Sequence, residues 1–277
     1  MIIDMHANLL PDDPEAIDQM RRIGNVVADP ARCTLSGTVE RLDSYGIDQA
    51  VVWRIGRSAG ECRRNNDFVA AAAGRYPDRL IPFATVWPHD QDGAVHEAER
   101  AVSELGMRGI KLHPVLMKEE IGAPGFLTVV DCARQLDVPF VTHVDLTVLG
   151  QLTPGGPYTA ADRPRPEDRS PFAEPEGLSG VLDVWDSPRV QAAHMGGLWL
   201  EEVRSSKITF QTTGASRRVL QWAVDNLGAD RIVFGADYPF YFVDDELIKV
   251  TSLQASQAEK EAILSGNALT RVLAEPR

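Results

Sequence analysis

Short apolar runs alternate with longer segments of helical periodicity along most of the chain. The apolar runs are rich in Ile, Val and Leu and end at Gly, Pro or Asp, which is typical of buried strands. Between them, apolar residues recur every three or four positions, as expected for helices that bury one face. We predict strands at 2–6, 49–53, 80–87, 109–112, 138–144, 189–194, 207–212 and 231–236, and helices at 38–45, 66–73, 91–105, 126–136, 178–185, 217–227, 256–264 and 267–273, with 11–30 irregular.

This alternation predicts one closed barrel rather than two domains. Strands separated by helices pair in parallel through right-handed crossovers, and eight such units in 277 residues favour a (β/α)₈ barrel of the TIM type. A segment rich in Pro and Gly at about 150–177 interrupts the pattern. We interpret it as a long irregular active-site loop inside a single domain that spans 1–277.

The composition excludes several classes of protein. The apolar and charged fractions, 44% and 25%, are those of a globular protein, and the net charge of −12 argues against a nucleic-acid partner. The cysteines Cys33, Cys62 and Cys132 are too far apart to indicate a thiolate metal site or a disulfide framework. No apolar run is long enough to span a bilayer, and no secretory signal is recognisable, so we expect a cytoplasmic protein without membrane association.

Histidines end three of the predicted strands, and an aspartate follows the last one. His6, His143 and His194 each close an apolar run, and Asp237 comes directly after the eighth strand. A single such histidine is most often a hydrogen-bonded core residue. In a barrel, however, the carboxyl ends of all strands meet at one face, which gathers these four side chains. Imidazole with one carboxylate suits Zn²⁺, and a catalytic site leaves one position open for water.

Several motifs occur in a characteristic order: Ile3-Asp4-Met5-His6, Tyr76-Pro77-Asp78-Arg79-Leu80, Gly109-Ile110-Lys111-Leu112-His113-Pro114, Thr142-His143, Ala193-His194-Met195-Gly196-Gly197, Phe234-Gly235-Ala236-Asp237-Tyr238-Pro239 and Gly266-Asn267-Ala268. Together they resemble the amidohydrolase superfamily, in the branch related to aminocarboxymuconate-semialdehyde decarboxylase. The resemblance implies that His6, His143 and Asp237 hold one divalent metal, and Asn8 is a further candidate ligand. It also implies that His194 and Asp237 are catalytic and move a proton, and that a homodimer is an expected assembly.

Asn8 departs from the family pattern, because members usually carry His-x-His where this chain has His6-Ala7-Asn8. An amide oxygen is a harder and weaker donor than imidazole. Asn8 is therefore either a weak ligand that favours a harder ion such as Mn²⁺, or a substrate contact beside a metal that is loosely held or absent. The expected cofactor is one divalent ion, Zn²⁺ first and Mn²⁺ second.

Cationic side chains near the predicted mouth are candidates for substrate binding. Lys111 is placed either to contact a substrate carboxylate or to pair with an acid across the barrel, and His113 either contacts substrate or shapes the turn before Pro114. Arg54 directly follows the second strand and is the arginine nearest the mouth. Asp145 either orients a histidine or caps a loop, and the long loop adds Arg163, Arg165 and Arg169.

The residues favour a metal-dependent hydrolase of a small amide or lactone, in which metal-bound water attacks a carbonyl. The first alternative is a non-oxidative decarboxylase of an aromatic or enoic acid, which needs protonation at carbon instead. The second is a metal-free, non-catalytic or cyclase-like barrel. The ligand set does not separate the first two, and in both the partner is a small molecule, with a carboxylate as one option.

Overall fold

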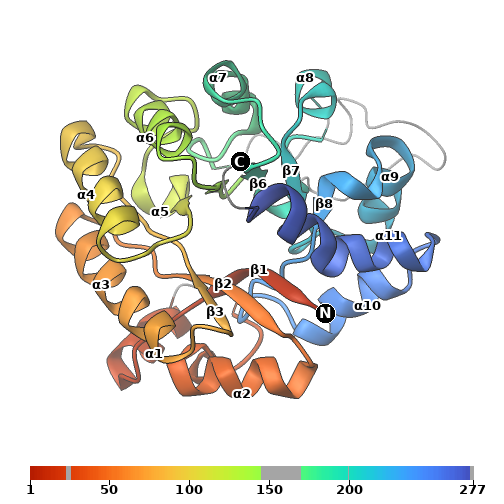
Figure 1. The fold of residues 1–277 in the computed structure, drawn as a ribbon, viewed down its shortest axis with the longest axis horizontal. Coiled ribbons are helices and arrows are strands. Elements are labelled where there is room, and N and C mark those ends of the chain that lie inside the picture. Colours follow the sequence, from red (N-terminus) through yellow and green to blue (C-terminus); the bar gives the residue numbers. More distant parts are fainter. Residues whose placement is uncertain (23–25, 145–169, 199, 275–277) are drawn as a thin grey trace.

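The structure is a computed structural model that describes residues 1–22, 26–144, 170–198 and 200–274. Eight parallel strands form the centre, and helices surround them on the outside (Figure 1). The strands are β1 (Ile3–Asn8), β2 (Gln49–Trp53), β3 (Leu80–Pro82), β4 (Ile110–Leu112), β5 (Phe140–Thr142), β6 (Val190–Ala192), β7 (Thr209–Gln211) and β8 (Ile232–Val233). The architecture is the (β/α)₈ barrel that the sequence predicts.

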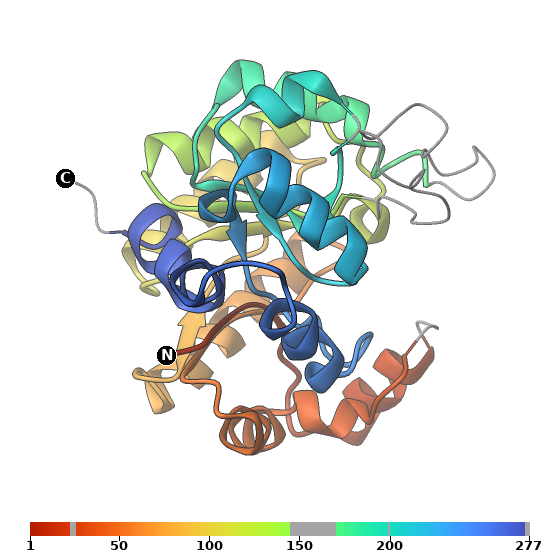
Figure 2. The same cartoon turned by 90° about the vertical axis from the view of Figure 1, so that its right-hand side faces the viewer.

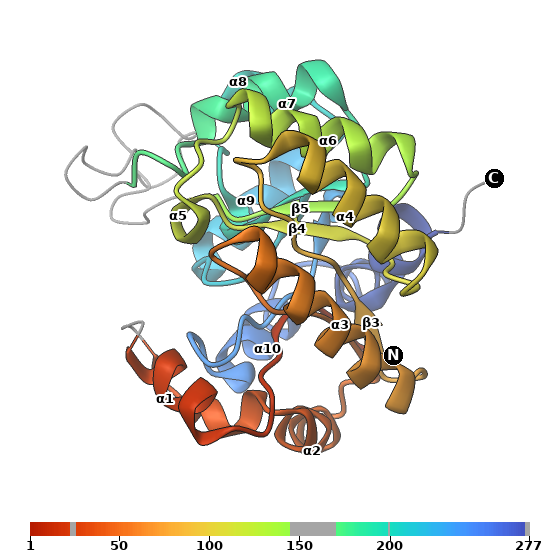
Figure 3. The same ribbon diagram turned by 90° about the vertical axis from the view of Figure 1, so that its left-hand side faces the viewer.

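The outer layer follows the strands in chain order. Its α-helices are α1 (Pro14–Arg22), α2 (Leu35–Tyr45), α3 (Ala59–Arg75), α4 (Gln91–Ser103), α5 (Pro114–Met117), α6 (Pro124–Gln135), α7 (Leu178–Val184), α8 (Glu201–Ser205), α9 (Arg217–Leu227), α10 (Val243–Thr251) and α11 (Gln257–Glu261). Helical turns at Ala262–Gly266 and Ala268–Val272 complete the described chain. Helices α1 and α5, which follow the carboxyl ends of β1 and β4, lie at the end of the barrel opposite the amino terminus (Figure 3). Figure 2 shows Met1 and the last helical turns at the other end.

Two short junctions close the ring of strands. Strands β1–β3 and β4–β8 form two ladders, which are joined by bridges between Ala84 and Ile110 and between Ala7 and Tyr238. At the second junction the Asp237 amide donates to the His6 carbonyl at 2.8 Å. The last strand therefore delivers Asp237 directly beside the end of the first.

A bulge in β1 changes which way its side chains face. Asp4 pairs with Ala50 and Ala7 with Val52, so β1 contains one residue more than β2 over this stretch. Asp4 faces outward to Arg41 on α2, whereas His6 contacts Trp53 inside the barrel. Regular alternation along a strand would place Asp4 and His6 on one face, but the extra residue reverses the facing direction within β1.

The helices differ from the prediction where their apolar stripe is thin. Helix α1 lies inside the segment that was expected to be irregular. Its helical pattern is weak in the sequence because Ala16 and Met20 are its only buried residues. Helix α3 begins seven residues before the predicted start of 66, at Ala59, where the Ser58 side chain caps the Glu61 amide, and it continues through Gly74. Helices α8 and α10 were not predicted. Strand β3 ends at Pro82, earlier than expected.

Two further sequence expectations concern the membrane and the cysteines. Within the described parts of the chain, every helix is too short or too polar to cross a bilayer. All three cysteines are buried and carry free thiols.

The outward-facing Asp4 makes a buried ion pair that reinforces the β1–β8 junction. Its Oδ1 accepts from the amides of His6 at 3.0 Å and Ala236 at 2.8 Å, and its Oδ2 lies 3.8 Å from Nη1 of Arg41. Both side chains are fully buried, and the guanidinium lies over the Tyr238 ring at 4.7 Å. Burial raises the Asp4 pKa to about 6, against the opposing effect of Arg41.

Replacing Arg41 by Met should destabilise the protein by about 3 kcal/mol or more, because removing one partner strands the other charge in the interior. Urea unfolding measures this difference. Arg75→Met, at the exposed end of α3, serves as the matched control and should change stability by less than about 0.5 kcal/mol. Equal stability of the two variants would show that the buried pair contributes nothing.

Candidate active site

Three histidines and one aspartate meet at the carboxyl ends of the strands, as the sequence predicts. His6 Nε2 lies 3.3 Å from Asp237 Oδ1, and His194 Nε2 lies 4.0 Å from Asp237 Oδ2. His143 Nδ1 lies 2.9 Å from His194 Nε2. Side chains from β1 and from the ends of β5, β6 and β8 thus converge on one point.

Two of these residues have an unusual backbone conformation. His194 and Asp237 adopt left-handed φ angles of 60° and 50°, which are uncommon for residues other than glycine. The turns directly after β6 and β8 are therefore sharp, and they aim both side chains back toward the barrel axis. Such backbone strain is characteristic of functional sites.

The His6 ring is held in one orientation by Gln211 on β7. His6 Nδ1 lies 2.6 Å from Gln211 Oε1, which can only accept a hydrogen bond. The Gln211 amide nitrogen is oriented in turn by the Met5 carbonyl and by Gln191. Nδ1 therefore carries the proton, and the unprotonated Nε2 faces Asp237, which is the form of imidazole that binds a cation.

His194 is oriented in a similar way by Thr213. Its Nδ1 lies 3.2 Å from the Thr213 carbonyl, which can only accept, so Nδ1 carries the proton. Nε2 is then an acceptor, and it receives the hydrogen bond from His143 Nδ1. The His143 ring is also stacked on His113, with centroids 4.1 Å apart and planes 11° apart.

The imidazoles are neutral in this environment. Burial is the main cause that lowers the pKa of His6, His113 and His143 well below the usual histidine value, and it lowers that of His194 to about 3. Burial also raises the pKa of Asp237, against the opposing charge of Lys111. Neutral rings keep their lone pairs free for a cation.

Three of these side chains fit a divalent metal ion. His6, His194 and Asp237 are buried, and one donor atom from each lies within 4.8 Å of the others. Ligands on a first-row metal at about 2.0–2.2 Å from the ion require only a small contraction of this cluster. The donor set, imidazole nitrogen with carboxylate oxygen, is that of catalytic metal sites.

Asn8 holds Asp237 in place. Its amide nitrogen donates to Asp237 Oδ1 at 3.1 Å and to the Tyr238 carbonyl at 3.2 Å. The ligating atom of an asparagine is its oxygen, so this arrangement shows a hydrogen-bond donor that orients the carboxylate. Metal ligation by Asn8 stays a prediction.

Lys111 brings a positive charge into the site. Its side chain is 1% exposed, and among the described residues its Nζ has no hydrogen-bond partner. Nζ lies 5.0 Å from the centroid of the Trp53 ring. Burial lowers the Lys111 pKa, and Asp237 opposes this change. Of the two roles predicted for Lys111, a close pair with an acid is not observed within the described chain.

His113 and Arg54 lie nearer the mouth. His113 is partly buried, and its Nδ1 accepts from the Leu116 amide at 3.5 Å, which caps α5, so it shapes the turn and also stacks on His143. Arg54 follows Trp53 at the end of β2, and its Nε donates to Asn65 at 3.1 Å. Substrate binding by either residue remains a prediction.

Some predicted residues lie outside the described parts of the chain. Asp145, Arg163, Arg165 and Arg169 belong to this group, as does most of the predicted loop at about 150–177.

Sequence reasoning missed Gln211, Thr213 and Trp53. Thr209 and Gln211 flank the apolar Phe210 in the predicted seventh strand, and this alternation could have identified an inward polar face. Trp53 ends the second strand, where an aromatic residue looks like ordinary core.

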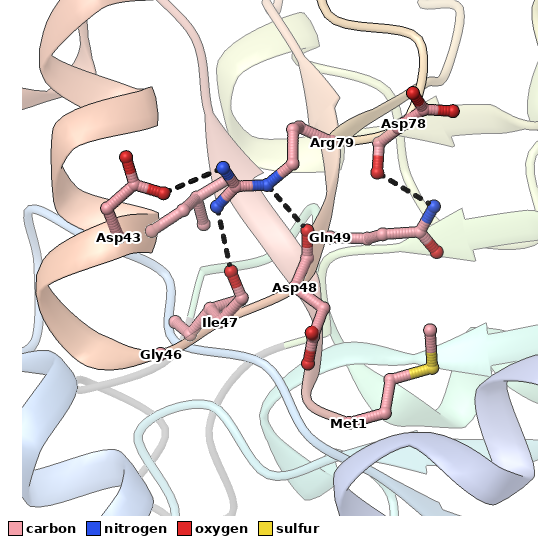
Figure 4. A pocket seen from close by; sticks show the side chains of 9 residues that line it. Met1, Asp43, Gly46, Ile47, Asp48, Gln49, Asp78 and Arg79 are labelled. Atoms are coloured by element: carbon pink, nitrogen blue, oxygen red, sulfur yellow. Dashed lines mark hydrogen bonds and ion pairs between the residues drawn. The ribbon is translucent and has the colours of Figure 1, made fainter.

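A hollow lies at the opposite end of the barrel, between Met1, Asp43, Asp48, Asp78 and Arg79 (Figure 4). The Arg79 guanidinium is already bound to Asp43 and to the carbonyls of Ile47 and Asp48. Chemistry in this fold occurs at the other face, so we assign no site here.

A closed parallel barrel with buried histidines and a carboxylate at the carboxyl ends of its strands defines a class of enzymes that use a metal at that face. The amidohydrolase family model matches residues 3–271, and the chain belongs to this family. This confirms the resemblance inferred from the motifs.

Curated and solved relatives add a reaction type. The chain is 24% identical over 257 residues to gamma-resorcylate decarboxylase of Polaromonas sp. (strain JS666), covering 76% of each protein. A 2,6-dihydroxybenzoate decarboxylase complexed with 2,6-dihydroxybenzoate aligns with a TM-score of 0.72 and 19% identity, over 96% of this chain and 97% of that one. The dihydroxybenzoic acid decarboxylase of Polaromonas sp. JS666, with bound manganese and 2-nitroresorcinol, aligns with a TM-score of 0.71 and 19% identity, over 96% and 95% of the two chains.

These relatives overturn the prediction of a hydrolase. They are named as decarboxylases, which was the first alternative. The physical reason for the error is that histidines, a carboxylate and a metal serve both reactions. The ligands alone do not reveal whether water attacks a carbonyl or a proton is delivered to carbon.

Replacing Gln211 by Met should weaken Mn²⁺ binding about 10–100-fold, because the His6 ring loses the acceptor that fixes its orientation. Isothermal titration of the metal-stripped protein measures the affinity. Gln135→Met on the exposed face of α6 is the control and should leave it unchanged. An unaltered Kd in the Gln211 variant would contradict the positioning role.

His194 should remain neutral in the metal-free protein between pH 8 and pH 5, because its folded pKa is about 3. The unfolded chain binds this proton below about pH 6.5, whereas the folded chain does not. The His194 contribution to stability is therefore lost progressively as the pH falls from about 6.5 toward 3. Imidazole ¹⁵N NMR checks the ring directly, and a His194 titration midpoint above pH 5.5 would contradict it.

Proposed function

We propose that the protein is a metal-dependent, non-oxidative decarboxylase of a small aromatic carboxylic acid. The observation that carries this proposal is the meeting of a cation-binding cluster, His6, His194 and Asp237, with the buried ammonium of Lys111. An acidic substrate needs positive charge at the site, and this chain has a net charge of −12. The names of the relatives support the reaction type.

His6, His194 and Asp237 would hold the metal, with His143 beside them. When bound, a divalent ion supplies positive charge that orients an anionic substrate and stabilises charge on it. We propose Mn²⁺ in preference to the Zn²⁺ expected from the sequence. Manganese is the ion named in three of the similar structures, and a carboxylate with a neighbouring amide suits a harder ion.

The side chains of the protein would then have separate roles in the reaction. Lys111 holds the leaving carboxylate by charge. The bond between the ring carbon and the carboxylate breaks, CO₂ leaves, and the electron pair stays on the ring carbon. Asp237, whose Oδ2 lies 4.0 Å from His194 Nε2, holds and delivers the proton that forms the new C–H bond, while His194 Nε2 serves as a metal ligand.

Incubation with a panel of hydroxybenzoic acids and Mn²⁺ should release CO₂ and yield the corresponding phenol. In D₂O, the product should carry one deuterium at the carbon that lost the carboxylate, because that carbon is protonated from exchangeable groups. Removing the metal with a chelator should abolish turnover, and Mn²⁺ should restore it. Gas detection, chromatography and mass spectrometry measure these outcomes.

Asp237→Asn should lower the rate at least about 10²-fold, in the range expected for loss of a proton-transfer group. Asp225→Asn on the exposed side of α9 is the matched control and should retain activity. Cleavage of an amide or lactone without CO₂ release would reject decarboxylation.

A further inference from the structure

Lys111 occupies an unusual position for a lysine. It projects from β4 into the barrel beside the metal-binding cluster, and it is almost completely buried. Among the described residues its Nζ makes no hydrogen bond, and the face of Trp53 is its neighbour at 5.0 Å. An ammonium in this setting is stabilised far less than one that is paired with a carboxylate.

The charge of Lys111 acts on the whole cluster. It is among the causes that lower the pKa of His6, His113, His143 and His194, and it opposes the rise at Asp237. The nitrogen is therefore close enough to influence every side chain that would hold a metal.

The other charges near the cluster are already paired or lie at its edge. Asp4 faces Arg41, and Glu246 faces Lys249, although Asp4 and Glu246 still contribute to the raised pKa of Asp237. The charge of Arg57 contributes to the lowered pKa of His113. Within the described chain, Asp237 accepts from Asn8 and lies 3.3 Å from His6 Nε2, whereas Lys111 Nζ has no hydrogen-bond partner at the cluster.

A divalent cation entering this cluster meets one carboxylate, neutral imidazoles and an ammonium. The ammonium repels the cation, and the low polarity of a buried site strengthens that repulsion. A carboxylate that binds beside Nζ cancels the ammonium charge and removes the obstacle. Linkage then requires the reverse effect of equal size, so that the metal also strengthens carboxylate binding.

We propose that Lys111 makes metal binding and carboxylate binding mutually dependent: alone it weakens the metal, and a carboxylate ligand relieves that effect. This inference rests on the proposed function and deepens it, because it gives Lys111 a role in the affinity for the metal. The site then binds metal tightly only when an acidic substrate is present.

The test measures Mn²⁺ affinity without turnover, by the electron paramagnetic resonance signal of free Mn²⁺ in metal-stripped protein. Benzoate is the carboxylate probe, and benzamide is its neutral counterpart of the same shape. In the wild-type protein, benzoate should lower the Mn²⁺ Kd about ten-fold, within the usual range of coupling between sites, and benzamide should have little effect. This comparison needs no variant.

Lys111→Met should bind Mn²⁺ about ten-fold more tightly than the wild type when no benzoate is present, and benzoate should no longer change its Kd. Lys111→Arg should keep the dependence on benzoate. Lys207→Met, on the exposed segment before β7, is the matched control and should behave as the wild type. Thermal unfolding monitors whether each variant is folded.

The results separate this inference from the proposed function. A wild type that releases CO₂ and binds Mn²⁺, but whose Kd is unaffected by benzoate or by Lys111→Met, overturns the role of Lys111 alone. Weaker Mn²⁺ binding in Lys111→Met than in the wild type also overturns the role of Lys111. So does a benzoate effect that persists in Lys111→Met, because the carboxylate would then act on the metal directly. A protein that binds no Mn²⁺ in any form overturns both, and Mn²⁺ uptake gained only in Lys111→Met supports this inference.

Discussion

The site depends on the junction between the first and last strands. The Asp237 amide donates to the His6 carbonyl at 2.8 Å, so the two residues that face each other as candidate ligands are also neighbours through the backbone. Asp4 adds a second link, because one of its oxygens accepts from both the His6 and the Ala236 amides. Residues more than 200 positions apart are thus fixed by hydrogen bonds of the main chain rather than by side-chain contacts alone.

The bulge in β1 makes this arrangement possible. Without it, a strand that turns Asp4 toward Arg41 would also turn His6 away from the barrel axis, because side chains alternate. One inserted residue lets Asp4 face Arg41 in the outer layer while His6 and Asn8 face Asp237 in the site. The left-handed turns at His194 and Asp237 achieve the same re-aiming at two other strand ends. Local departures from regular strand geometry therefore place the chemical groups, and the regular barrel holds those departures in position.

These departures from regular strand geometry also limit how much of the structure could be predicted from the sequence. The barrel, the gathering of His6, His143, His194 and Asp237, and the bounds of β2 and α9 follow from strand order and periodicity, since both depend on patterns that are local in the chain. The side chains that orient these four residues could not be predicted in this way. Gln211 is fixed by a partner on β1, and Asp4 by a partner on α2 and a bulge, so their roles depend on pairings between distant segments. Helix α1 was missed because its buried stripe is thin and its surface is mostly charged. The reaction type was misjudged because the same donors serve two chemistries.

The positive charge of Lys111 distinguishes the two chemistries better than the ligands or Asp237 do. Burial raises the pKa of Asp237 in the metal-free protein, and a carboxyl group with a pKa near the working pH can take a proton from water or deliver one to carbon. Asp237 therefore fits both hydrolysis and decarboxylation. Under the proposed function, the buried Lys111 ammonium would attract the carboxylate of an acidic substrate. A neutral amide or lactone carries no charge that could pair with this ammonium. The proposal of a decarboxylase is thus supported by the charge of Lys111 and by the names of the relatives.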